Sequence, residues 1–118
     1  MTILIVDDDD VWVKVVTRYF TELKYKVFSS YTWAGALALA DQHVPRAILI
    51  DGSLPDGTSS GFCATLRANA KFDKTALIVV SGDDRAADCC KADKFVLKGG
   101  SLSEVEAAIT EALKAKAA

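Results

Sequence analysis

Five side chains suited to phosphoryl chemistry stand at the ends of short apolar runs in this chain. They are Asp7, Asp8, Asp51, Ser81 and Lys98. Carboxylates ligate divalent cations and act as nucleophiles, whereas a hydroxyl and an ammonium group stabilise the oxygens of a phosphoryl group. If one pocket gathers these groups, it holds what phosphoryl transfer chiefly needs, which is in-line positioning and neutralisation of charge.

The runs that precede these residues predict β-strands of a buried parallel sheet. They are short, rich in Ile, Leu and Val, and alternate along the chain with segments of helical periodicity. Ligands of such sheets bind just beyond the carboxyl ends of the strands, so we expect the five side chains at one edge. The runs cover residues 3–6, 47–50, 77–80 and 95–97.

The segments between these runs predict helices, so that a β-α unit repeats five times. Helices are expected at 11–23, 33–42, 62–70, 85–91 and 102–113, and a weaker edge strand at 26–29. Thr32 is placed to cap the second helix, and Ser101 with Glu104 predicts a capping box on the last one. The stretch 52–61 is rich in Gly, Ser, Pro and Asp and predicts the longest loop. Right-handed crossovers then predict a doubly wound α/β sheet with helices on both faces.

Length and composition indicate one domain over residues 1–118, with a frayed tail after about residue 114. The net charge of −2 gives no reason to expect direct binding to nucleic acid. No apolar stretch is long enough to insert in a membrane, and no signal-peptide pattern opens the chain. The odd set of cysteines favours reduced thiols in a cytoplasmic protein. These are Cys63, Cys89 and Cys90.

The aspartates that follow the first and third apolar runs predict a metal site. Asp9 and Asp10 are expected only to favour the start of the next helix, where acids complement the helix dipole. Asp7, Asp8 and Asp51 stand at the strand ends, where three like charges repel unless a cation is present. Mg²⁺ suits such a set, because it is held by one or two carboxylates with water and phosphate oxygens. We expect Asp8 and Asp51 to ligate it, with Asp7 assisting directly or through water.

Asp51 is the candidate nucleophile, because it stands directly at the end of the buried run Ile-Leu-Ile. Attack of its carboxylate on phosphorus would give an acyl phosphate. Lys98 is expected to pair with the acids and to clamp the incoming phosphoryl group. Ser81 is expected to hydrogen-bond a phosphoryl oxygen.

Four motifs carry a resemblance to a known family. They are Ile3-Leu4-Ile5-Val6-Asp7-Asp8, Ile48-Leu49-Ile50-Asp51 with Pro55, Val79-Val80-Ser81-Gly82, and Phe95-Val96-Leu97-Lys98. With them the chain resembles a response-regulator receiver domain of two-component signalling, over essentially its whole length. The resemblance implies a flavodoxin-like (βα)5 fold with strand order 2-1-3-4-5.

The resemblance also implies roles for these residues. Asp51 would be the phosphoacceptor, and Mg²⁺ (or Mn²⁺) would be held by Asp7, Asp8, Asp51 and the backbone carbonyl of Ser53. Ser81 and Phe95 would be switch residues that alter the face formed by the fourth helix, fifth strand and fifth helix. The phosphoryl group would come from a sensor histidine kinase or a histidine phosphotransfer protein. The altered face would then control an output partner or a homodimer. Such a protein catalyses its own phosphorylation and dephosphorylation and is not a turnover enzyme.

The chain departs from the family pattern after Lys98, where Gly99 and Gly100 replace the usual proline. A cis bond before glycine costs about 2.5–4 kcal/mol, so we expect a trans and more mobile connection. Phe95 also lacks the hydroxyl of tyrosine, and burial of its ring is therefore expected.

Two alternative functions are consistent with parts of the sequence. One is a receiver-like interaction module in which phosphorylation is lost or incidental, suggested by Gly99 and the long loop. The other is a haloacid-dehalogenase-type phosphohydrolase with Asp7 as nucleophile, suggested by the D-x-D of residues 7–9. The second leaves Asp51 without a role.

Overall fold

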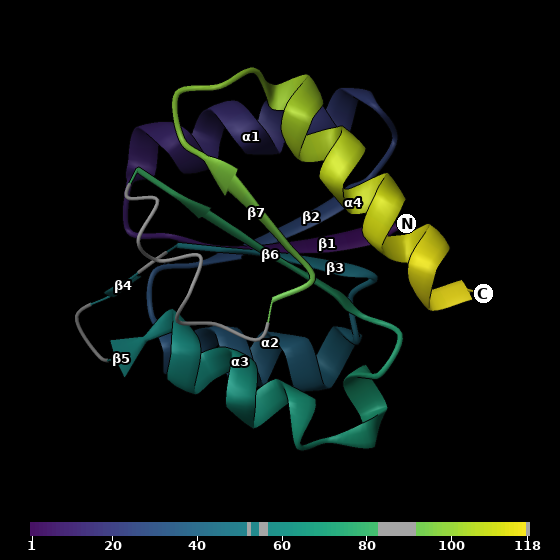
Figure 1. Ribbon diagram of the computed structural model, residues 1–118. Helices are drawn as coiled ribbons and strands as arrows, with labels where there is room; N and C mark the ends of the chain where they lie inside the picture. Colours follow the sequence, from purple (N-terminus) through teal and green to yellow (C-terminus); the bar gives the residue numbers. More distant parts are fainter. Residues whose placement is uncertain (52, 55–56, 83–91, 118) are drawn as a thin grey trace.

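The structure, a computed structural model, describes residues 1–51, 53–54, 57–82 and 92–117 (Figure 1). The strands are β1 (Thr2–Val6), β2 (Lys26–Ser30), β3 (Ala47–Ile50), β4 (Ser53–Leu54), β5 (Gly57–Thr58), β6 (Ala76–Ser81) and β7 (Lys94–Leu97). The helices are α1 (Asp10–Glu22), α2 (Trp33–His43), α3 (Ser59–Arg67), a 3₁₀ turn η1 (Ala70–Phe72) and α4 (Leu102–Ala117). The helix expected at 85–91, with Cys89 and Cys90, lies outside the described residues.

Five parallel strands form the central sheet in the order β2-β1-β3-β6-β7. Counted along the chain, these are strands 2-1-3-4-5, so the flavodoxin-like topology is confirmed. The weak run at 26–29 is the edge strand β2, as expected. Val6 is in register with both Ser30 and Ile50, and Ser81 with Leu97, so the strands end in step. This common ending brings the residues that follow each strand to one edge.

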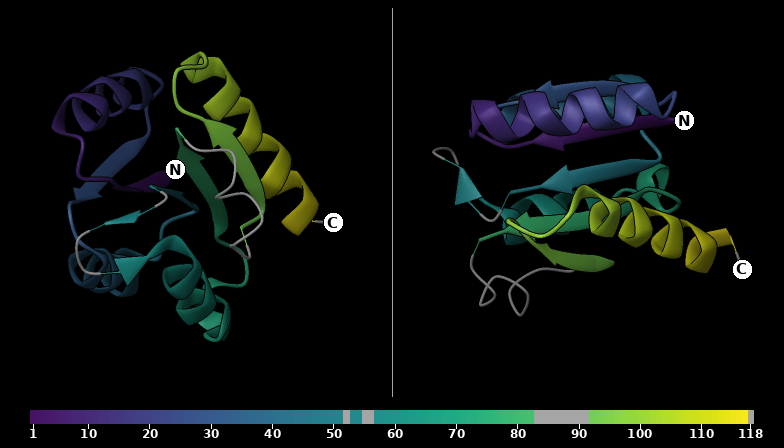
Figure 2. Two further views of the ribbon diagram at one scale, coloured as in Figure 1. Left: turned by 60° about the vertical axis from the view of Figure 1, so that its left-hand side comes forward. Right: turned by 90° about the horizontal axis from the view of Figure 1, so that it is seen from above.

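Helices cover both faces of the sheet: α1 and α4 lie on one side and α2 and α3 on the other (Figure 1), and the right view of Figure 2 looks onto α1 and α4. One hydrophobic cluster packs α1 and α4 against one face, and the other packs α2, α3 and η1 against the opposite face. Strands β1, β3 and β6 supply buried residues to both clusters in alternation, because successive side chains point to opposite faces. Their uninterrupted apolar sequences follow directly from this two-sided burial.

Capping explains where two helices begin. Asp9 caps α1 by accepting a hydrogen bond from the Trp12 amide, and Thr32 caps α2 by accepting one from the Gly35 amide. The predicted Thr32 cap is confirmed, and Asp9, expected to favour the start of this helix, does so as its N-cap. The capping box on the last helix does not form, since the Ser101 hydroxyl lies 2.7 Å from the Ser103 hydroxyl instead. The Glu104 amide bonds to the Ser101 backbone carbonyl at 3.1 Å, so α4 starts on a backbone turn.

The segment after Asp51 was predicted as a loop, and that prediction was wrong in part. The described parts of 52–61 include a short antiparallel pair in which Ser53 faces Thr58 and Leu54 faces Gly57. Helix α3 begins at Ser59 and not at 62, and it ends at Arg67 before the separate turn η1. Turn-forming residues therefore concealed a hairpin, because Gly, Ser and Asp also favour tight connections between strands.

Candidate functional site

The sheet ladder itself positions the residues at the carboxyl edge. The Asp7 amide donates to the Ser30 carbonyl at 3.1 Å, and the Asp51 amide donates to the Val6 carbonyl at 2.8 Å. The Lys98 amide donates to the Ser81 carbonyl at 2.9 Å. Each site residue thus extends the strand pairing by one step beyond its strand, which holds its backbone rigidly at the edge.

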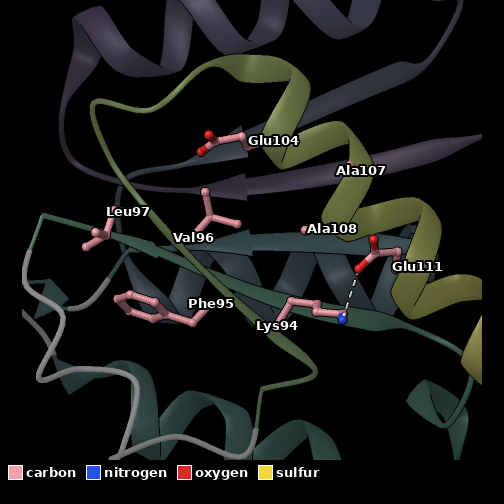
Figure 3. A pocket seen from close by; sticks show the side chains of 8 residues that line it. All are labelled: Lys94, Phe95, Val96, Leu97, Glu104, Ala107, Ala108 and Glu111. Carbon is pink, nitrogen blue, oxygen red and sulfur yellow. Dashed lines mark ion pairs between the residues drawn. The ribbon is translucent and has the colours of Figure 1, made fainter.

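Alternation along the strands then decides which side chains meet. Asp7, Asp51 and Lys98 each follow a residue of the α2/α3 face by one position, so they fall on the α1/α4 face. Figure 3 shows this alternation on β7, where Val96 and Phe95 lie on opposite sides of the strand. Asp7, Asp51 and Lys98 therefore converge at one corner.

An ion-pair cluster forms at that corner. The Lys98 Nζ lies 2.7 Å from Asp7 Oδ2 and 3.8 Å from Asp51 Oδ1. Asp7 is only 1% exposed, and its Oδ1 accepts a hydrogen bond from the Asp9 amide at 2.9 Å. Two carboxylates, those of Asp7 and Asp51, thus share the Lys98 ammonium group. The cluster carries an excess of negative charge in a poorly solvated place.

The donor set fits a small divalent cation. One carboxylate oxygen from each of Asp7, Asp8 and Asp51 lies within 4.8 Å of the others. Asp7 Oδ2 is buried, and its partner among the described residues is the Lys98 ammonium group at 2.7 Å. Carboxylates that outnumber the nearby ammonium group repel one another, and a bound cation would relieve this repulsion. Oxygen ligands of this kind are those that Mg²⁺ prefers.

The remaining residues of the predicted site lie around this corner. Ser81 is 7% exposed and, by alternation, falls on the α2/α3 face with Val79. Phe95 is in register with Val79 and packs, partly buried, against the same cluster. Ser81 and Phe95 are therefore diagonal neighbours on one face of the β6–β7 pair. Ser53 begins β4, two residues after Asp51.

Asp10 forms a separate surface pair beside the site. Its Oδ2 lies 3.0 Å from the Lys14 ammonium, and its Oδ1 accepts a hydrogen bond from the Tyr31 hydroxyl at 3.0 Å. The bond to Lys14 first, and the bond to Tyr31 second, hold the pKa of Asp10 below its usual value. The same contact with Asp10 raises the pKa of Tyr31. Asp10 is thus fully engaged in the first turn of α1, as predicted, and stays outside the metal cluster.

Gly99 determines the backbone path that leaves Lys98. Its φ angle is +99°, in the region that L side chains rarely adopt. No cis peptide bond occurs among the described residues, which confirms the expected trans connection. Proline, with φ fixed near −65°, could not follow this path.

Trp12, which lies within the helix predicted at 11–23, is a site residue that the sequence pattern did not indicate. Its indole ring lies 5.6 Å, centroid to nitrogen, from the Lys98 Nζ. The two residues are far apart in the sequence, so helix periodicity gave no signal for the contact. The placement of both residues on the α1/α4 face of the sheet would have indicated this contact.

Comparison with known proteins identifies the family. The response regulator receiver domain matches residues 3–110, and the chain therefore belongs to this family of two-component signalling proteins.

Individual relatives agree with the assignment. The transcriptional regulatory protein KdpE of Mycobacterium tuberculosis is 26% identical over 117 residues, which are 95% of this chain and 50% of that protein. The chain thus spans about half the length of the curated relatives it matches.

Solved structures show the same fold. A sensor protein from Polaromonas sp. JS666 superposes with a TM-score of 0.88 at 18% identity, covering 98% of this chain and 97% of that one. The BeF3-activated receiver domain of Klebsiella pneumoniae RstA gives 0.84 at 18% identity, covering 97% and 99%. Among the described residues, no helix is long and apolar enough to span a membrane.

Proposed function

We propose that this receiver domain is a phosphorylation-dependent signalling module whose phosphoacceptor is Asp51. A carboxylate oxygen of Asp51 forms the new O–P bond as the N–P bond of a phosphohistidine breaks. The electron pair of the broken bond stays on the imidazole, whose other nitrogen carries a proton, so that the ring leaves in its neutral form. The donor is a sensor histidine kinase or a histidine phosphotransfer protein.

The observation that carries this proposal is the position of Lys98 between two acids. Its Nζ contacts Asp7 at 2.7 Å and stands 3.8 Å from Asp51. An ammonium group so close to Asp51 can follow the charge that arrives with a phosphoryl group, without a large movement. Asp7 is nearly fully buried and already engaged by Lys98 and the Asp9 amide, which disfavours it as the nucleophile.

The acidic corner supports a Mg²⁺ or Mn²⁺ requirement. Asp7, Asp8 and Asp51 would hold the ion, with the backbone carbonyl of Ser53 as a further ligand. When bound, the ion supplies positive charge that offsets the phosphoryl oxygens. The ion pair between Asp7 and Lys98 then offsets the charges that remain at the corner.

The response to phosphorylation would pass through Ser81 and Phe95. Ser81 would hydrogen-bond a phosphoryl oxygen, and Phe95, its diagonal neighbour on the same face, would move into the space that this opens. The groove between β7 and α4, about 600 Å³ in volume, belongs to the surface that would change (Figure 3). An output domain, a partner or a second copy would recognise that surface, since a ligand shifts the equilibrium only by its differential affinity.

Intact mass after incubation with Mg²⁺ and a small acyl-phosphate donor tests the proposal. We expect one phosphoryl adduct that hydroxylamine removes. The adduct should be absent from Asp51→Asn and present in Asp41→Asn, which makes the same change at an exposed acid paired with Lys71.

Two outcomes would redirect the assignment. An adduct that survives in Asp51→Asn but is lost in Asp7→Asn would favour a phosphohydrolase-type nucleophile. No adduct from the small donor, and none from a histidine kinase, would favour an interaction module that works without phosphorylation.

A further inference from the structure

We infer that Trp12 is a positioning residue, whose indole face holds the Lys98 ammonium group in place beside the acids. The Nζ lies 5.6 Å from the centroid of the ring, within the range of a cation–π contact. This inference rests on the proposed function for its consequence in phosphorylation, but the contact itself can be tested without it.

The position of the indole is fixed from the helix side. The Asp9 carboxylate accepts the Trp12 amide at 3.2 Å, which ties the first turn of α1 to the acidic loop. The ring packs, partly buried, against the cluster formed by α1, α4 and the sheet. A large, rigid side chain with two rotatable bonds is thereby presented toward the carboxyl edge.

The Lys98 side chain needs a contact that restrains its ammonium group. The Gly99–Gly100 pair that follows it, with Gly99 at φ +99°, contributes no side chain of its own to restrain the lysine. The flexible lysine stem loses considerable rotamer entropy when its ammonium group is held in one place. The side chain of Lys98 is nevertheless only 22% exposed, so the pocket holds it.

An aromatic face suits this task better than other side chains. A further acid would compete with Asp51 for the ammonium group and add negative charge to a crowded corner. An aliphatic side chain would desolvate the ammonium without compensation. The indole attracts the cation through its quadrupole, carries no charge, and leaves the N–H bonds free to turn from Asp7 toward a phosphoryl group on Asp51.

The test compares the parent chain with Trp12→Phe, which keeps a smaller aromatic face, and Trp12→Leu, which keeps apolar bulk without one. In NMR spectra, we expect the indole ring current to shift the Lys98 side-chain resonances in the parent. That shift should shrink in Trp12→Phe and vanish in Trp12→Leu. The rate of adduct formation with an acyl-phosphate donor should fall about two- to fivefold in Trp12→Leu, which corresponds to about 0.5–1 kcal/mol, and less in Trp12→Phe.

The two arms separate the failure of this inference from the failure of the proposed function. Unshifted Lys98 resonances in the parent, or a Trp12→Leu variant with parental shifts and rate, would overturn the inference. A parent chain that forms no adduct with the small donor or with a histidine kinase would overturn the proposed function and leave the NMR arm to decide the contact. If Trp12→Leu does not fold, Lys98→Met serves instead, and an indole N–H resonance of Trp12 unchanged from the parent would contradict the contact.

Discussion

Each end of the sheet holds a cluster of ion pairs, but the ratio of acids to cations is reversed. One acid faces two cations at the amino end, and one cation faces two acids at the carboxyl end. At the amino end, Asp93 faces Arg67 at 2.6 Å and Lys116 at 3.2 Å, and it also accepts the Leu77 amide at 2.8 Å. At the carboxyl end, Lys98 serves Asp7 and Asp51 together.

The two clusters differ in role: the one around Asp93 supports the fold, and the one around Asp7 lies at the candidate functional site. Asp93 has its oxygens satisfied and ties three distant elements, α3, β6 and α4, to the start of β7. Asp7 shares its ammonium group with Asp51, in a cluster of acids that an added cation would stabilise. An acid that faces more than one cation contributes to folding, whereas acids that outnumber their cations favour the binding of a further cation.

The largest expected effect is the response of the carboxyl end to Mg²⁺. At a concentration 100-fold above its dissociation constant, the ion should raise the free energy of unfolding by about 2.7 kcal/mol. Asp8→Asn should abolish most of this gain, because it removes the most accessible ligand of the cluster. Urea unfolding with Mg²⁺ and with a chelator measures both values.

A change at the amino end serves as the control for that experiment. Asp93→Asn should keep the full Mg²⁺ response, since Asp93 lies at the opposite edge. An equal loss of response in Asp8→Asn and Asp93→Asn would show that the ion acts on global stability and not at the acidic corner, and the comparison would fail.

The second effect is the baseline stability of the amino end. Asp93→Ala leaves the amide of the fully buried Leu77 without its acceptor, and this should cost about 1–3 kcal/mol. The loss should be the same with and without Mg²⁺. Asp93→Asn should lose less, because the amide oxygen still accepts from Leu77. Equal stability of the parent and the alanine variant in urea would contradict a structural role.

The sequence predicts which residues stand at the carboxyl end of the sheet, but it does not predict contacts between side chains of remote elements. The strand ends were visible because each apolar run stops at a polar residue, and the parallel-sheet rule then joined Asp7, Asp51 and Lys98. Alternation along the strands, which separates these from Ser81, was also available in the sequence.

Contacts between remote side chains were not visible. The Asp93 network joins residues of three elements, and no local sequence pattern encodes how these elements lie relative to one another. The Trp12–Lys98 contact depends in the same way on how α1 packs over the sheet. The hairpin at Ser53–Thr58 was missed because its residue types are equally common in loops.

The smallest expected effect concerns the backbone that carries Lys98. A Cβ on Gly99 or on Gly82 would meet no heavy atom of the described residues within 4 Å, so the two positions differ in the positive φ of Gly99. Gly99→Ala should therefore cost about 1 kcal/mol or somewhat more, because a left-handed conformation disfavours a Cβ. Gly82→Ala should be neutral or slightly stabilising, because alanine restricts the unfolded chain more than glycine does. Urea midpoints of the two variants measure the difference.

Gly99→Pro should lose more stability than Gly99→Ala, even though proline is usual here in the family, since the φ of proline cannot become positive. A proline variant as stable as the parent would mean that the connection readily adopts another path, and that Gly99 does not fix the position of Lys98 at the acidic corner.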